Sequence, residues 1–147
     1  MRSVYFNGKF VPETEANISI YDSALMFGDM IFDMTRSYNK KQFRLRKHLE
    51  RLYNSMKSAE ISIDMSIDKM EKACLDTIKK NEAFFEPHDE HRLMINVSRG
   101  PLSIYAEIFE GKLEPTIIIA DFPLKWTVRG MDRLYEMGIN AIVTSQR

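Results

Sequence analysis

The stretch "RLRKHLERLYNSMKSAEI", residues 44–61, decides the fold, because its apolar residues recur at the spacing of an amphipathic helix. Leu49, Leu52 and Met56 form an apolar stripe of the kind that packs against a protein core. Charged residues occupy the opposite side of the same segment. The spacing predicts a helix over 47–59 that covers one face of the domain.

Arg51 stands at the border of this apolar stripe. It shares a helix face with His48 and Ser55, which lie three residues before it and four after it. Its aliphatic stem could simply cover apolar surface while the charge reaches water. Alternatively, its planar guanidinium could bind a phosphate or a carboxylate from a mostly buried position. The helix alone leaves both interpretations open.

Two predicted hairpins precede the helix. Residues 4–6 and 9–11 are short apolar runs that flank Asn7-Gly8, a dipeptide typical of tight hairpin turns. The second hairpin pairs an extended segment over 31–38 with a returning strand over 42–45, after a polar turn. The returning strand leads directly into the helix.

The second half of the chain adds a helix and further strands. Ser66 is a suitable N-cap for a helix that runs to Lys80. Hairpins followed by two helices and then strands indicate an α+β fold rather than a regular βαβ alternation. The remaining predicted elements are strands over 92–99, 116–121 and 139–145 and a short helix or irregular crossing over 128–138.

Composition excludes several classes of protein. Lysine plus arginine and aspartate plus glutamate number 21 each among 147 residues, so the net charge is zero, unlike that of a strongly basic nucleic-acid-binding domain. Cys74 is the single cysteine, which excludes an intramolecular disulfide and favours a reducing, cytoplasmic location. No apolar run approaches the ~20 residues of a membrane span. A weaker alternative function is nucleic-acid binding by a locally basic helix with Arg44, Arg46, Lys47 and Arg51.

The segment "HDEH" contains His88 and His91, three residues apart, with Asp89 and Glu90 between them. The spacing superficially suits a metal site, but the polar surroundings favour two solvated histidines. We predict no metal site there.

Several motifs together resemble one family. "FNGKFVP" (6–12), "FGD" (27–29), "IFDMTRSYN" (31–39) and "FRLRKHLERLYNSMK" (43–57) follow one another as in the fold-type IV pyridoxal-phosphate enzymes, the aminotransferase class IV family. "INVSRG" (95–100) and "GINAIVTSQR" (138–147) are similar to later strands of that family. The resemblance implies a small N-terminal domain over 1–123, with an antiparallel sheet and two helices. Residues 124–147 would then be an interdomain linker and the first strand of a truncated large domain.

The resemblance also implies site residues. Arg51 matches the family's arginine for the 5′-phosphate of pyridoxal phosphate. Phe32 matches an aromatic wall of the substrate pocket, and Arg92 is similar to a residue that faces the substrate carboxylate, although it lies two residues farther from "SRG" than is usual. Phe27 replaces a tyrosine near the active site of the partner subunit. Arg36 and Arg99 match family arginines for which we expect structural roles.

Departures from the family pattern argue against some of the reactions that the family catalyses. "SRGPLSIYAE" (98–107) lacks the Arg-x-His pair with which D-amino acid aminotransferases bind the substrate carboxylate. We therefore expect a branched-chain type of transfer between an L-amino acid and a 2-oxo acid, by an enzyme that forms a homodimer and binds neither nucleic acid nor membrane. The family's Schiff-base lysine has no match, since Lys125 is the last lysine, so the chain alone is expected to be inactive. An aminodeoxychorismate lyase-type reaction and a non-catalytic association domain remain alternatives.

Overall fold

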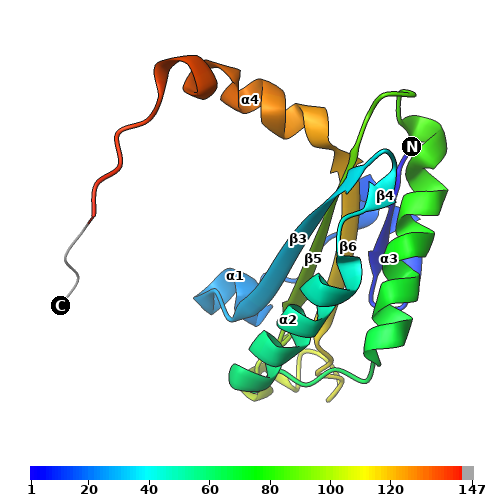
Figure 1. Cartoon of the computed structure of the whole chain (residues 1–147). Helices are drawn as coiled ribbons and strands as arrows, with labels where there is room; N and C mark the ends of the chain where they lie inside the picture. Colours follow the sequence, from blue (N-terminus) through cyan, green and yellow to red (C-terminus); the bar gives the residue numbers. More distant parts are fainter. Residues whose placement is uncertain (144–147) are drawn as a thin grey trace.

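One antiparallel sheet organises the molecule, and the computed structural model describes residues 1–143 of it. The six strands follow the order β2-β1-β6-β5-β3-β4, and each neighbouring pair runs antiparallel (Figure 1). The α+β prediction is therefore confirmed. The strands are β1 (Ser3–Phe6), β2 (Lys9–Pro12), β3 (Met30–Tyr38), β4 (Lys41–Gln42), β5 (His91–Ser98) and β6 (Thr116–Pro123).

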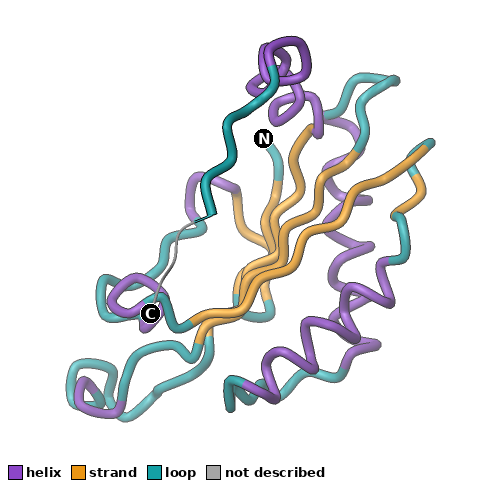
Figure 2. The backbone as a smooth tube through the Cα atoms, turned by 60° about the vertical axis from the view of Figure 1, so that its left-hand side comes forward, coloured by secondary structure: helices purple, strands orange, loops and turns teal. Residues whose placement is uncertain are grey.

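Two long helices, α2 (Leu45–Ser58) and α3 (Ile67–Asn81), lie on the same face of the sheet (Figure 2). Helix α2 begins two residues before its predicted start, because Leu45 is already buried in the core. Ser66 caps α3 as predicted, since its hydroxyl accepts a hydrogen bond from the Lys69 N–H. The fully buried side chains between helices and sheet include Leu49, Leu52, Met70, Cys74, Leu93, Ile95, Val97 and Ile119.

The predicted turn at Asn7-Gly8 is confirmed by its backbone. Both residues have positive φ angles, 44° and 87°, as the preferred two-residue hairpin turn requires. The Asn7 side chain also accepts a hydrogen bond from the Ile117 N–H at 2.6 Å. The first hairpin is thereby joined to the edge of β6.

Residues 1–143 leave the second face of the sheet largely uncovered. Alternation along β3 and β5 directs Phe32, Met34, Arg92 and Met94 to this side, where they are exposed or half-buried. Helix α4 (Leu124–Met137) leaves the end of β6 and contributes no buried residue (Figure 1). We call this side the open face.

Two segments differ from the predictions. The sequence pattern missed α1 (Ser23–Phe27), which is capped by the Asp22 carboxylate and ended by Gly28 in the left-handed conformation. The strand predicted over 139–145 is wrong for residues 139–143, which are exposed and pair with no described strand, while its last residues lie outside the described part. The crossing over 128–138 is helical and belongs to α4. No helix within residues 1–143 combines the length and apolar character needed to cross a bilayer.

Candidate functional site

Arg51 is held by a carboxylate at the edge of the sheet. Its Nε and Nη2 donate hydrogen bonds to Asp33 Oδ2 and Oδ1, at 2.9 and 2.7 Å. Asp33 comes from the middle of β3, on the side that faces α2, and only 2% of its side chain is exposed. Two parallel hydrogen bonds fix both the position and the plane of the guanidinium.

His48, one helical turn before Arg51, binds the same carboxylate. Its Nδ1 lies 2.9 Å from Asp33 Oδ1. Burial alone would raise the pKa of Asp33, but the hydrogen bonds from Arg51 and His48 outweigh burial and lower it. Asp33 raises the pKa of Arg51 in return, chiefly through the hydrogen bonds. The pair therefore stays ionised at neutral pH.

The rest of the Arg51 side chain remains open to a ligand. It is 66% exposed, not mostly buried as the phosphate interpretation assumed, and it lies beside β3 at a level that β4 does not reach, because β4 pairs only with Ser37 and Tyr38. Within the described residues, Nη1 makes no hydrogen bond, so its two N–H groups are available. Arg51 lines a groove together with Ile31, Asn54 and Ser55, and the last two add further polar groups. This donor set fits a phosphate group.

Phe32 and Arg92 both lie on the open face, at different levels of the sheet. Phe32 follows Ile31, which lines the Arg51 groove, and is 58% exposed. Arg92 pairs with Arg36, four residues farther along β3, or about 13 Å at the rise of a strand. Its guanidinium donates to the Thr127 hydroxyl of α4 and to the Met34 sulfur. The structure thus places Arg92 on the same wall as Phe32 without bringing them into contact.

Phe27 ends α1, and its side chain is 64% exposed. It lies before the start of β3, away from the Arg51 groove residues. Arg99 has the structural contacts expected of it. It donates to Asp29 and to the carbonyl oxygens of Ala59 and Glu60, and so joins the end of α2 to the start of β3.

Asp33 is the site residue that sequence reasoning missed. Alternation in "IFDMT" hides it, because Phe32 and Met34 form the apolar side of the strand and Asp33 stands on the more polar side, which the structure nevertheless buries. A buried carboxylate needs a cationic or hydrogen-bonding partner. Arg51 and His48 on the following helix were the available partners.

The prediction of two solvated histidines in "HDEH" was wrong for His91. It is the first residue of β5 and is fully buried, with Nδ1 2.9 Å from Asp121 Oδ2 and Nε2 2.9 Å from Glu82 Oε2. The ring of Phe85 stacks on it at 4.1 Å. Only His88 of the two is exposed. No cluster in residues 1–143 has the composition of a metal site.

Replacing Asp33 with asparagine is expected to lower the free energy of unfolding by about 1–2 kcal/mol at pH 7, because the amide cannot accept both charged hydrogen bonds. The lowered pKa of Asp33 means that its stabilisation is present above about pH 3.9 and is lost as the pH falls through the folded value. Urea denaturation at pH 7 and near pH 3 should therefore show a difference between wild type and variant that shrinks in acid. Asp64→Asn, at an exposed position, is the control; an equal Asp33 effect at both pH values would contradict the assignment.

Comparison with known proteins relates the chain to one family. A family model described as amino-transferase class IV matches residues 30–147. A putative branched-chain-amino-acid aminotransferase of Methanocaldococcus jannaschii is 34% identical over 145 residues, which cover 98% of this chain and 46% of that protein. The chain therefore spans less than half the length of this relative.

Solved structures show the same fold. The branched-chain amino acid aminotransferase from Escherichia coli superposes with a TM-score of 0.68 at 26% identity, over 83% of this chain and 41% of that one. A hypothetical aminotransferase from Mycobacterium tuberculosis, in its PLP-bound form, has a TM-score of 0.69 at 20% identity, over 89% and 43% of the two chains. The second likeness speaks for the fold alone.

Proposed function

Because the chain belongs to the amino-transferase class IV family, we propose that it forms part of an enzyme that transfers an amino group between a branched-chain L-amino acid and a 2-oxo acid. The observation that carries the proposal is the Arg51 guanidinium, fixed by buried Asp33 and open on its other edge. The cofactor of this family, pyridoxal phosphate, carries a phosphate dianion that suits such a donor. Named relatives of branched-chain type support the substrate class.

Each site residue has a role in this proposal. Arg51 binds the cofactor phosphate through its free Nη1 edge, and Asp33 holds the guanidinium in place for it. Phe32 forms an apolar wall beside the reacting centre and excludes water from it. Arg92 binds the substrate carboxylate from the far end of the same face, after releasing the Thr127 hydroxyl.

The chemistry itself requires groups that we do not assign to these residues. Pyridoxal phosphate supplies the electron sink for removal of the α-proton when it is bound. The lysine that moves this proton in the family has no counterpart that we can assign here, and we propose that these 147 residues alone do not catalyse transfer. Mixing the purified chain with pyridoxal phosphate, L-leucine and 2-oxoglutarate should yield no glutamate.

We further propose the domain division and the assembly that the family implies. Residues 1–123 would form the small domain, and 124–147 the linker and the start of a large domain that covers the open face. The uncovered sheet face and the exposure of α4 support this division. A homodimer is supported by neighbouring exposed apolar residues on α1, just before it and on the 102–113 connection; the rings of Tyr21, before α1, and Tyr105, on the connection, lie 4.9 Å apart. These residues are Ile20, Leu25, Phe27, Ile104 and Ile108.

Replacing Arg51 with methionine is expected to weaken binding of pyridoxine 5′-phosphate by at least about tenfold, because a charge-assisted contact is lost. Pyridoxine phosphate is the suitable probe, since it has no aldehyde and cannot react with lysines. NMR titration should show shifts of the Asn54 and Ser55 amides with pyridoxine phosphate and none with pyridoxine.

Arg46→Met is the matched control, because Arg46 lies on the same helix but pairs with Asp68 and Glu71. It should leave the affinity for pyridoxine phosphate unchanged. Equal affinity of the Arg51→Met variant and the wild-type chain would refute the phosphate role. Equal shifts with both pyridoxine compounds would refute it as well.

A further inference from the structure

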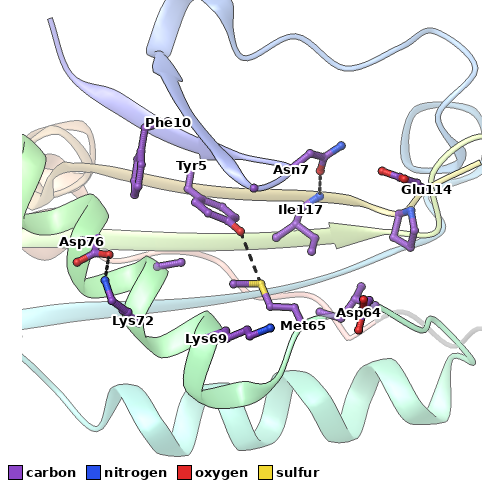
Figure 3. Close-up of a pocket in the computed structure, with 14 residues that line it drawn as sticks. Tyr5, Asn7, Phe10, Asp64, Met65, Lys69, Lys72, Asp76, Glu114 and Ile117 are labelled. Carbon is purple, nitrogen blue, oxygen red and sulfur yellow. Dashed lines mark hydrogen bonds and ion pairs between the residues drawn. The ribbon is translucent and has the colours of Figure 1, made fainter. Parts of the chain in front are cut away.

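A separate cavity of about 620 Å³ lies on the helix-covered side of the sheet. The β1–β2 hairpin, residues 63–65, residues 69–76 of α3 and residues 114–117 surround it (Figure 3). Phe32 and Arg92 lie on the opposite face, so the sheet separates this cavity from the proposed substrate wall. Its volume is within the range of small-molecule pockets.

The lining of this cavity includes a preformed apolar surface. The Tyr5 hydroxyl contacts the Met65 sulfur at 3.8 Å, and the Phe10 ring packs edge-on against Tyr5 with centroids 5.6 Å apart. Ile117 continues this surface, and its N–H is bound by the Asn7 side chain (Figure 3). Because these side chains are fixed by contacts with one another, an apolar ligand group would find its surface already in place.

The charged residues of the lining do not all neutralise one another. Lys72 pairs with Asp76 one turn along α3. Lys69, Asp64 and Glu114 also line the cavity, and none of them forms an ion pair within the part of the chain that the structure describes. Figure 3 shows Lys69 extended toward the side of the cavity where Asp64 lies. Unpaired charges of both signs therefore border one apolar surface.

We propose that this cavity binds a zwitterionic α-amino acid with an apolar side chain. Lys69 binds the carboxylate, Asp64 and Glu114 bind the ammonium group, and the side chain packs on Tyr5, Met65 and Ile117. A ligand with only one of the two charges leaves the opposite charge of the site without a partner. The proposal depends on the contacts of this cavity and not on the proposed transfer reaction.

The test is an NMR titration of the full 147-residue chain with L-leucine, 4-methylpentanoate and isopentylamine, which share an apolar branched body. L-leucine should shift the amides of Tyr5, Met65 and Ile117, and the two singly charged probes should bind at least about tenfold more weakly. Lys69→Met should weaken L-leucine binding by a similar factor. Lys79→Met, an exposed position on the same helix outside the cavity, should not change it.

Three outcomes would overturn the proposal: no shift at these amides, equal binding of all three probes, or equal binding by the Lys69→Met variant and the wild-type chain. Shifts confined to Phe32, Met94 and their neighbours would place L-leucine on the open face and would also overturn it. Failure of the proposed function would instead appear at Asn54 and Ser55 with pyridoxine phosphate. The two failures are thus distinguishable in one set of spectra.

Discussion

Replacing His91 with leucine is expected to lower the free energy of unfolding by about 3–5 kcal/mol, because it leaves the Asp121 carboxylate buried without its cationic partner. Both side chains are fully buried, with His91 Nδ1 2.9 Å from Asp121 Oδ2. Urea denaturation at pH 6 measures the loss.

The double variant His91→Leu, Asp121→Leu is the informative control for this prediction. It removes both charges, and replacing a whole buried pair by apolar residues of similar size is often nearly neutral. It should therefore be more stable than His91→Leu alone. A single variant that loses less than about 1 kcal/mol would show that the pair does not hold a charge.

The same residue predicts how stability changes with pH. Burial alone would lower the pKa of His91, but hydrogen bonds and charge interactions with Asp121 and Glu82 raise it. A raised pKa in the folded state means that the stabilisation is complete below about pH 6.5 and is lost as the pH rises through the folded value. Lys40 pairs with Glu82, and the charge of Arg2 acts on Asp121, so both belong to the same network. Stability of the wild-type chain should fall between pH 6 and alkaline pH, whereas the His91→Leu variant should lack this decline.

Replacing Gly100 with alanine is the second change with a large expected effect, a loss of about 3 kcal/mol or more in the free energy of unfolding. Gly100 has a φ of +78°, and a Cβ there would lie 2.0 Å from the carbonyl oxygen of Glu114. That neighbour is backbone, so the chain must shift to relieve the contact. The Gly100 carbonyl also accepts the Ser23 N–H, so a shift would disturb the start of α1.

The Gly28→Ala variant separates the cost of the positive φ from the cost of the steric contact with the Glu114 carbonyl oxygen. Gly28 has a similar φ of +68°, but a Cβ there would meet no atom within 4 Å. Its alanine variant should lose only about 1 kcal/mol, the cost of the left-handed conformation. Comparable losses in the two variants, measured by thermal or urea unfolding, would show that close packing at Gly100 is unimportant.

The sequence was most informative where one local signal decides an element. Asn7-Gly8 predicts its turn by backbone preference, and Ser66 predicts the start of α3 by capping. Helix α1 has only five residues, too few for a periodic apolar pattern, and depends on Asp22, which also accepts the Thr116 hydroxyl at 2.6 Å. Such distant partners are invisible to local patterns.

The candidate site could be predicted only in part, because local patterns identify single residues but not their distant partners. Arg51 was identifiable because its helix spacing conflicts with its charge. Its pairing with Asp33 depends on how α2 crosses β3, which packing decides. His91 was misinterpreted because its acidic neighbours in sequence suggest solvent, whereas strand alternation turns its ring into the core.

The position of β1 has a consequence for how the chain folds during synthesis. The β1–β2 hairpin is synthesised well before β6, yet β1 lies between β2 and β6, with Tyr5 opposite Ile119. β1 therefore cannot complete its pairing until β6, the last strand of the described sheet, has been synthesised. Such long-range pairing slows folding, and an unpaired strand edge is exposed to aggregation meanwhile. A nascent chain arrested before residue 116 should remain a substrate for chaperones that bind extended apolar segments.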